Sequence, residues 1–343
     1  MSPQLGVVRA AWAVDAGVVH LLPRLRSWGP HAARLLLVAA CYYLGARLGL
    51  LRALVDDQVT PLWPPTGVAL LSLLLGGLRL WPGIAVAAFV VNAPLGGVGE
   101  ALLICAGNTL APVVGFLLLR RVGFRLELDR TRDALSLVLL GAFTGMLVSA
   151  TVGSGALLLS GVVDGVDFWA TWSVWWTGDV LGVLVLVPLA LTARSLRGRR
   201  PAPRRVVEAV ALLVSTTAVM AVATTTDIRL MYLVFPFLIW AAFRFGHAGT
   251  APCALIAAVL AAHGATRASG PFEGLELLVR MVTLQAFNGT VVTTALLLSA
   301  VVAERNAARA AIERTVAQLT DVVSRHRPLL VRDVPPPRPP EAR

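Results

Sequence analysis

An acidic residue inside an apolar segment is the feature of this sequence best suited to chemistry. Asp179 lies about midway along the apolar segment 168–193, so we expect it near the midplane of a membrane. An unpaired carboxylate at that depth costs at least about 2.5–3.5 kcal/mol, which makes an intramembrane acid a candidate functional residue. The alternative is a purely structural hydrogen bond to Asn108 or Thr109 on another helix.

Two tryptophans precede this acid by about one helical turn. Trp175 and Trp176 lie four and three residues before Asp179. Tryptophan commonly anchors a helix at the membrane interface, but these two lie deeper than an anchor requires. We therefore expect either a cavity lined by indole rings or a displaced interfacial anchor.

The segment Pro61–Gly67 opens the second apolar stretch with Trp63 and tandem prolines. Proline suits the first turn of a helix because its φ angle is fixed and it carries no N–H group. The functional interpretation places the N-terminus of this helix, with Thr66, against a ligand or an anionic group. The structural alternative is a rigid helix start at the membrane interface.

Other polar residues lie within or at the ends of apolar segments. Asn92, Asn108 and Asn288 are expected to pair between helices. Arg79 and Arg244 end two short apolar segments in similar settings, which hints at an internal repeat of the kind that transporters have. The candidate ligand-binding or signalling residues are Asp179, Trp176, Trp175, Asn108, Trp63, Thr66, Asn92 and Arg244.

Enzymatic motifs and metal-ligand spacings are missing from the sequence. It contains no GxGxxG followed by an acid, no P-loop and no HExxH, and its five histidines are scattered. The three cysteines each stand alone in an apolar stretch without a CxxC pair. We predict no catalytic residue, no metal site and no cofactor, and therefore a protein that is not an enzyme.

The composition indicates an integral membrane protein. Hydrophobic residues make up 57% of the chain and charged residues 14%, and the net charge is +11. Basic residues are spread between apolar runs rather than gathered on one face, so we predict the lipid bilayer and not nucleic acid as the partner of this chain.

Ten apolar segments have the length of helices. A bilayer core of about 30 Å needs about 20 apolar residues in a helix. Two pairs of segments are short and joined by tight turns at Trp81-Pro82-Gly83 and Gly246-His247, so either pair could be a re-entrant hairpin. We predict an all-α polytopic transmembrane bundle of 8–10 spans with an even number of crossings, built from segments 32–54, 65–80, 82–98, 100–120, 134–160, 168–193, 206–225, 230–245, 248–265 and 277–303.

The arginines predict the orientation of this bundle. They cluster before the first segment, between the fourth and fifth, and between the sixth and seventh, whereas the alternate loops carry mainly acidic residues. Short loops rich in arginine stay in the cytoplasm. No signal peptide is evident near the N-terminus. Both termini are therefore predicted to be cytoplasmic, with residues 1–31 forming an N-terminal cytoplasmic segment ahead of the membrane domain 32–303.

The composition changes abruptly after residue 303. We predict that residues 304–327 form a cytoplasmic helix with one apolar stripe and that 328–343 form a disordered proline-rich tail. The stripe predicts a short coiled coil, for which a second copy of this chain is one partner and another protein is the other. The alternative is a frayed extension of the last span. The stripe consists of Ile312, Val316, Leu319 and Val323.

Several blocks of the sequence resemble, in order over roughly residues 35–303, the membrane-associated sensor domain called MASE type 1. The most specific blocks are Trp63-Pro64-Pro65-Thr66-Gly67 and Trp175-Trp176-Thr177-Gly178-Asp179; the others are Tyr42–Leu50, Gly107–Leu110 and Trp240–Gly246. The resemblance implies a bacterial sensory module of about eight spans. Family members are usually fused to a cytoplasmic output domain such as a histidine kinase, a diguanylate cyclase or a phosphodiesterase. The resemblance brings no ligand.

From these observations we predict a sensor in the bacterial cytoplasmic membrane. It would detect a ligand or a membrane partner between its helices and pass the change through the last span to a cytoplasmic helix. That helix would act on a separately encoded kinase, cyclase or other output protein. The alternative function is a small-solute transporter or channel subunit.

Overall fold

The computed structural model describes residues 29–51, 59–198, 201–226 and 230–332. Beyond Asp321 only the course of the last helix is described. Most of the predicted N-terminal segment and the end of the proline-rich tail lie outside the described residues.

Within the described residues, all ten predicted apolar segments are mainly helical. The chain runs through an N-terminal helix Gly29–Leu50, α2 (Pro64–Gly76), α3 (Trp81–Asn92), α4 (Val98–Arg121), α5 (Thr131–Ser136), a π-helical segment η2 (Leu137–Thr144), α6 (Leu147–Leu159), α7 (Phe168–Ser195), α8 (Pro203–Thr225), α9 (Val234–Phe245), α10 (His247–Thr266) and α11 (Leu277–Arg332). Short 3-10 turns precede α3, α7, α9 and α11.

Seven of these helices are long and apolar enough to cross a membrane, which makes the chain a multi-pass membrane protein. They are the N-terminal helix, α4, the α5–α6 helix, α7, α8, α10 and α11; α2, α3 and α9 belong to shorter apolar helices. Because seven is odd, the predicted even number of crossings requires at least one shorter helix to cross as well.

The two predicted short pairs turn in different ways. Gly246 has a φ of 59° between α9 and α10, at the predicted turn. In the first pair the chain instead turns at Gly77, which has a φ of 77°. The prediction that Trp81-Pro82-Gly83 forms this turn is wrong, since these residues begin α3. Proline within the first turn of a helix is a start signal, because the missing N–H has no helical partner there in any case.

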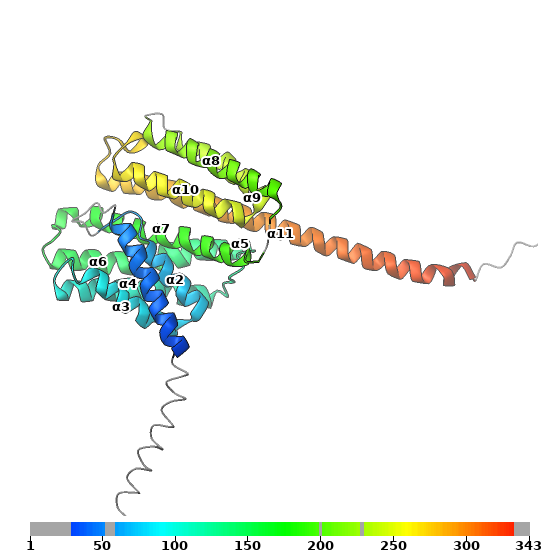
Figure 1. Cartoon of the computed structure of the whole chain (residues 1–343), viewed down its shortest axis with the longest axis horizontal. Helices are drawn as coiled ribbons and strands as arrows, with labels where there is room; N and C mark the ends of the chain where they lie inside the picture. Colours follow the sequence, from blue (N-terminus) through cyan, green and yellow to red (C-terminus); the bar gives the residue numbers. More distant parts are fainter. Residues whose placement is uncertain (1–28, 52–58, 199–200, 227–229, 333–343) are drawn as a thin grey trace, which may run out of the picture.

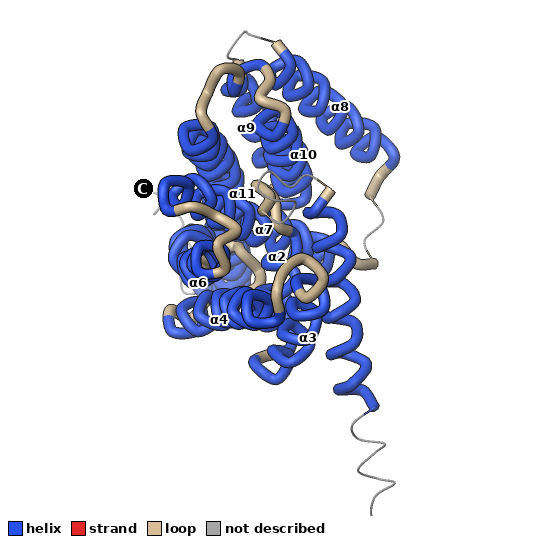
Figure 2. The backbone as a smooth tube through the Cα atoms, turned by 90° about the vertical axis from the view of Figure 1, so that its left-hand side faces the viewer, coloured by secondary structure: helices blue, strands red, loops and turns tan. Residues whose placement is uncertain are grey.

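The helices form a bundle in which α7 is central and α8 peripheral (Figures 1 and 2). In the most apolar part of each span, 78% of the residues are buried in the span that contains α7, but only 22% are buried in α8. α7 packs against α2, α6, α10 and α11. Many leucines and valines of the outer helices are exposed, as expected where lipid is the solvent, including Leu36, Leu37, Leu44 and Leu48.

The last helix continues without a break from the bundle into the predicted cytoplasmic region (Figure 1). The change in composition after residue 303 does not interrupt α11, because helical hydrogen bonds are local and charged residues also favour helices. α11 runs to Arg332, past the predicted boundary at 327. On the extension Ile312, Val316 and Leu319 are exposed, while the side chain of Val323 lies outside the described residues.

Candidate functional site

The second helix begins in the interior of the bundle. Trp63 immediately precedes the first residue of α2. The backbone N–H of Trp63 donates to the carbonyl oxygen of Gly178 on α7 over 3.0 Å. Pro64 and Pro65 occupy the first two helical positions. Since prolines have no N–H, two of the donors that a helix start leaves unpaired are removed. The tandem prolines thus allow a helix to start where water is excluded.

Glycines bring α2 and α7 into backbone contact. A Cβ atom on Gly67 would collide with the carbonyl oxygen of Gly182, and one on Gly182 would collide with the carbonyl oxygen of Trp63. Gly178 lies four residues before Gly182, which is the small-residue spacing that permits close helix packing in membranes. A close approach at Gly67 is expected from its sequence, but the partner of this contact, α7, was not predicted.

The carboxylate of Asp179 lies at the end of α2. Asp179 is fully buried, and one of its oxygens accepts a hydrogen bond from the hydroxyl of Thr66. Its second oxygen has no partner. It lies 14 residues from Gly165 and 16 from Ser195, the ends of its span. Asp179 therefore lies near the middle of its helical span, as predicted. The N-terminus of α2, which is the positive end of its dipole, lies beside the acid.

Neighbouring polar groups form a chain of two hydrogen bonds beside this carboxylate. The indole N–H of Trp175 donates to the hydroxyl of Ser149 over 3.1 Å, and Ser149 donates to the side-chain oxygen of Asn108 over 2.8 Å. Both Ser149 and Trp175 adjoin Asp179. These two hydrogen bonds connect α4, α6 and α7 next to the acid.

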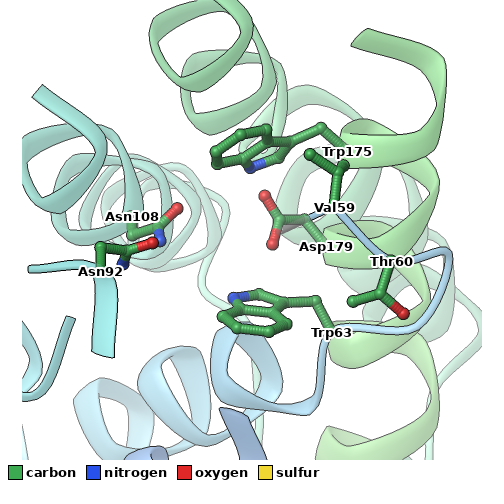
Figure 3. Close-up of a pocket in the computed structure, with 7 residues that line it drawn as sticks. All are labelled: Val59, Thr60, Trp63, Asn92, Asn108, Trp175 and Asp179. Atoms are coloured by element: carbon green, nitrogen blue, oxygen red, sulfur yellow. The ribbon is translucent and has the colours of Figure 1, made fainter. Parts of the chain in front are cut away.

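A small cavity lies at the centre of these groups (Figure 3). The carboxylate of Asp179 lies between the indoles of Trp175 and Trp63, with the two asparagines across from it. The volume is about 20 Å³, which is room for a single water molecule but not for an organic ligand. The lining residues are Val59, Thr60, Trp63, Asn92, Asn108, Trp175 and Asp179.

The structure brings together six of the eight candidate residues. Trp176 and Arg244 do not line the cavity. The Trp176 indole N–H donates to the Phe143 carbonyl oxygen over 3.0 Å, on the side of η2. Arg244 forms an ion pair with Glu208 on α8, with 2.7 Å between nitrogen and oxygen.

Tyr42 was not among the predicted site residues, although it lies beside the cavity. Its side chain is fully buried, its hydroxyl has no partner, and it neighbours Asp179, Trp63 and Asn108. The available signal was its place in Tyr42–Leu50, one of the blocks that carry the family resemblance.

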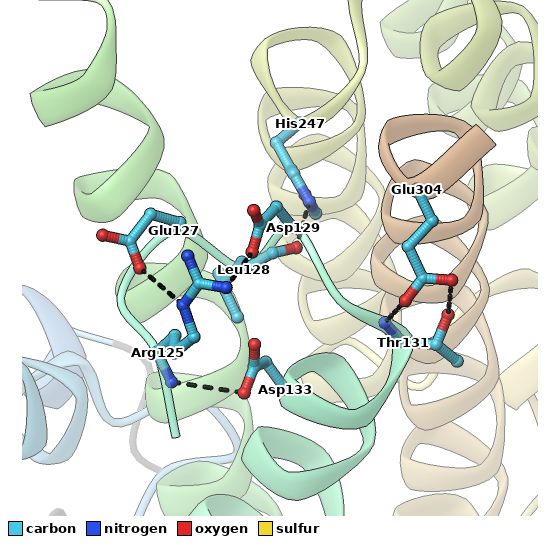
Figure 4. Close-up of polar contacts among 8 residues, drawn as sticks. All are labelled: Arg125, Glu127, Leu128, Asp129, Thr131, Asp133, His247 and Glu304. Atoms are coloured by element: carbon cyan, nitrogen blue, oxygen red, sulfur yellow. Dashed lines mark hydrogen bonds and ion pairs between the residues drawn. The ribbon is translucent and has the colours of Figure 1, made fainter. Parts of the chain in front are cut away.

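A second polar cluster joins the α4–α5 loop to α11 (Figure 4). The carboxylate of Glu304 on α11 accepts hydrogen bonds from the backbone N–H of Thr131 over 2.8 Å and from its hydroxyl over 3.2 Å. Thr131 is the first residue of α5, so an acidic group caps a helix N-terminus there. In the same loop, the ring of His247 donates to the carbonyl oxygen of Leu128 over 2.8 Å.

Metal-binding clusters are not evident in the part of the chain that the structure describes. There, no three His, Cys, Asp or Glu side chains gather as they would around a metal ion.

No solved structure matches this chain. Among curated proteins, the probable diguanylate cyclase DgcE of Escherichia coli (strain K12) is 27% identical over 208 residues. The match covers 54% of this chain and 17% of that protein, so the chain spans less than a fifth of the length of this relative. Residues 34–306 match the model of one protein family, MASE1, over most of the chain. The resemblance seen in the sequence is thereby confirmed: the chain belongs to the MASE1 family of membrane sensory domains.

Proposed function

We propose that the chain detects a stimulus within the membrane and transmits it through α11 to a cytoplasmic output, without catalysing a reaction itself. The observation that carries this proposal is the continuity of α11. A single helix of 56 residues packs against α7, α9 and α10 inside the bundle and extends far beyond it. A rotation or shift of such a helix within the membrane moves the part outside the membrane as well, because no break separates the two.

The contact between Glu304 and Thr131 supports this route. It lies where α11 leaves the bundle, and α5 continues through η2 into α6, which packs against α7. A rearrangement around Asp179 therefore has a physical path to the point where α11 emerges.

For the output we propose a diguanylate cyclase or a related signalling enzyme, because the name of the E. coli relative includes that activity. We also propose that the exposed stripe of Ile312, Val316 and Leu319 pairs with a second copy of the chain. Three large apolar side chains at helical spacing on a solvated helix are best covered by a partner.

Inserting residues into α11 tests the proposal. The chain is fused after Arg332 to a diguanylate cyclase catalytic domain, so that all of α11 is kept. One to seven alanines are then inserted after Ala307, and cellular cyclic di-GMP is measured. Each residue turns the helix by about 100°, so seven residues, about two turns, restore the phase. We expect output to change with two added residues and to return with seven, the matched control for length. An output that ignores insertion length would show that α11 is only an anchor.

Transport is the second candidate function, and the geometry around Asp179 favours it specifically. Helices that start inside the membrane and point their N-termini at a polar site are typical of transporters. Proteoliposomes with a trapped pH dye or with radioactive sodium would distinguish the two functions. A flux that the Asp179→Asn variant abolishes would support transport, whereas vesicles no leakier than protein-free ones would exclude transport of these ions.

A further inference from the structure

A groove of about 560 Å³ lies between η2, α7 and α11, and Trp176 is among its lining residues. Its volume falls within the range of small-molecule sites. One wall is formed by Val138, Leu139 and Phe143, and the other by residues of α11 that include Gln285 and Gly289. We call this feature the α11 groove. Unlike the Asp179 cavity, it has room for an organic molecule.

Gln285 is the unusual residue of the α11 groove. Only 7% of its surface is exposed, and neither its amide nitrogen nor its amide oxygen has a hydrogen-bond partner. An amide offers two donors and two acceptor positions, and leaving them unpaired in an apolar setting is costly. A ligand with its own hydrogen-bonding group would remove that cost.

The rest of the lining defines what such a ligand is like. Every other lining residue is apolar, a glycine or a threonine, and no charged side chain is present. A charged head group would therefore lack a counter-charge, while a hydrocarbon without a head group would leave Gln285 unpaired. An uncharged amphiphile with one hydroxyl or carbonyl group would pair that group with Gln285 and pack its hydrocarbon part against the apolar lining.

Gly289 lies close to Phe143 of η2 in the α11 groove. A Cβ atom on Gly289 would lie 3.3 Å from the Phe143 ring, tighter than ordinary contact, so a larger side chain would press on the opposite wall. Phe143 belongs to η2, and π-helical turns are frequent at functional sites. The ring of Phe143 also contacts Trp176 edge-on, with 5.3 Å between centroids.

We propose that the α11 groove binds an uncharged, membrane-dissolved amphiphile whose hydroxyl or carbonyl group pairs with the amide of Gln285. The proposal deepens the proposed sensory function and rests on it for any signalling consequence, because the ligand would touch α11 directly. Binding itself does not depend on that function.

Photolabelling of the full-length protein in liposomes tests the binding. The probes are a C16 fatty alcohol with a mid-chain diazirine and the corresponding C16 alkane, and labelled peptides are identified by mass spectrometry. We expect the alcohol to label η2 and the 282–294 stretch of α11, and unlabelled hexadecanol to compete. In Gln285→Leu, labelling by the alcohol should fall about tenfold, the loss expected for one hydrogen bond to a buried amide.

Two variants control for indirect effects. Gln318→Leu makes the same change on the exposed extension of α11 and should label like the wild type. Ala286→Trp fills the groove from an exposed position and should abolish labelling there by both probes.

Three outcomes would overturn the proposal. Equal labelling by alcohol and alkane in every variant would mean that bulk lipid chains fill the groove. Labelling spread evenly over the outer helices would mean that no site exists. Efficient disulfide-linked dimers of Ala286→Cys would mean that a second copy covers it. Failure of the insertion experiment with normal labelling would instead refute signalling through α11 while leaving the site intact.

Discussion

Replacing Thr66 with valine tests whether Asp179 holds α2 in its buried position. Valine keeps the shape of threonine but removes the hydroxyl that donates to the acid, which leaves the carboxylate without its hydrogen bond to α2. A matched control exists in Thr109. It is also buried, but its hydroxyl does not donate to Asp179, so the same substitution there leaves the hydrogen bond of the acid intact.

The expected magnitude follows from two bounds. A hydrogen bond to a charged group contributes about 1.5–3 kcal/mol in proteins generally. Hydrogen bonds between membrane helices average about 0.6 kcal/mol and reach about 1.7 kcal/mol, since a helix in the unfolded state also finds partners. For a fully buried acid we expect the upper part of the membrane range, so Thr66→Val should lower the free energy of unfolding by about 1–1.7 kcal/mol. Thr109→Val should change it by less than about 0.5 kcal/mol, or stabilise the fold.

Reversible unfolding in bicelles with increasing SDS measures this difference, with the nine tryptophans as the fluorescent reporter. A double-mutant cycle with Asp179→Leu, which removes the acceptor oxygens, isolates the Thr66–Asp179 coupling. Equal losses for Thr66→Val and Thr109→Val, or additive effects in the cycle, would refute the reasoning.

The same cycle separates the structural from the functional interpretation of the acid. Replacing both partners of a buried hydrogen bond with apolar residues can be nearly neutral for stability. The double variant Thr66→Val/Asp179→Leu should then fold nearly as stably as the wild type. If it also transmits normally in the cyclase fusion, the acid serves packing alone.

Further predictions concern the contacts around this site and at the exit of α11. Gly182→Val should destabilise the fold by more than about 3 kcal/mol because backbone cannot move aside as a side chain can, whereas Gly155→Val, with open space around its Cβ, should be tolerated in the same unfolding assay. Glu304→Ala should increase amide hydrogen exchange in the first turn of α5 severalfold, a loss of about 0.5–1 kcal/mol, and Glu313→Ala should leave that exchange unchanged. Trp176→Phe should cost about 1 kcal/mol in unfolding free energy through the lost indole hydrogen bond.

Much of the fold could be predicted because the bilayer simplifies the problem. Hydrophobic length alone located all ten helices, since no other backbone conformation except a closed barrel is satisfied in lipid. The error at Trp81-Pro82-Gly83 shows the limit of local signals. Proline and glycine mark both a turn and a helix start, and only the φ of Gly77 decides between them.

The candidate site was predicted in part because polar residues are conspicuous in apolar helices. The partners of those residues could not be predicted. Thr66 bonding to Asp179 depends on α2 starting opposite the middle of α7, a contact over 113 positions in sequence. The sequence also could not reveal that the cavity is about 20 Å³ while a larger groove lies between η2, α7 and α11, because volumes depend on packing between helices.

Some of the buried polar groups without a hydrogen-bond partner lie on the two helices of the proposed signalling route. Asp179 on α7, and Gln285 and Asn288 on α11, are buried with polar atoms that have no protein partner. Each such group costs on the order of 1–3 kcal/mol when buried unpaired. Local conflicts of this kind are expected at functional sites, where a second arrangement or a bound ligand resolves them. We therefore expect that water beside Asp179 and an amphiphile beside Gln285 stabilise different positions of α11 relative to α7, and this difference is the free energy that a membrane stimulus has available to move the helix.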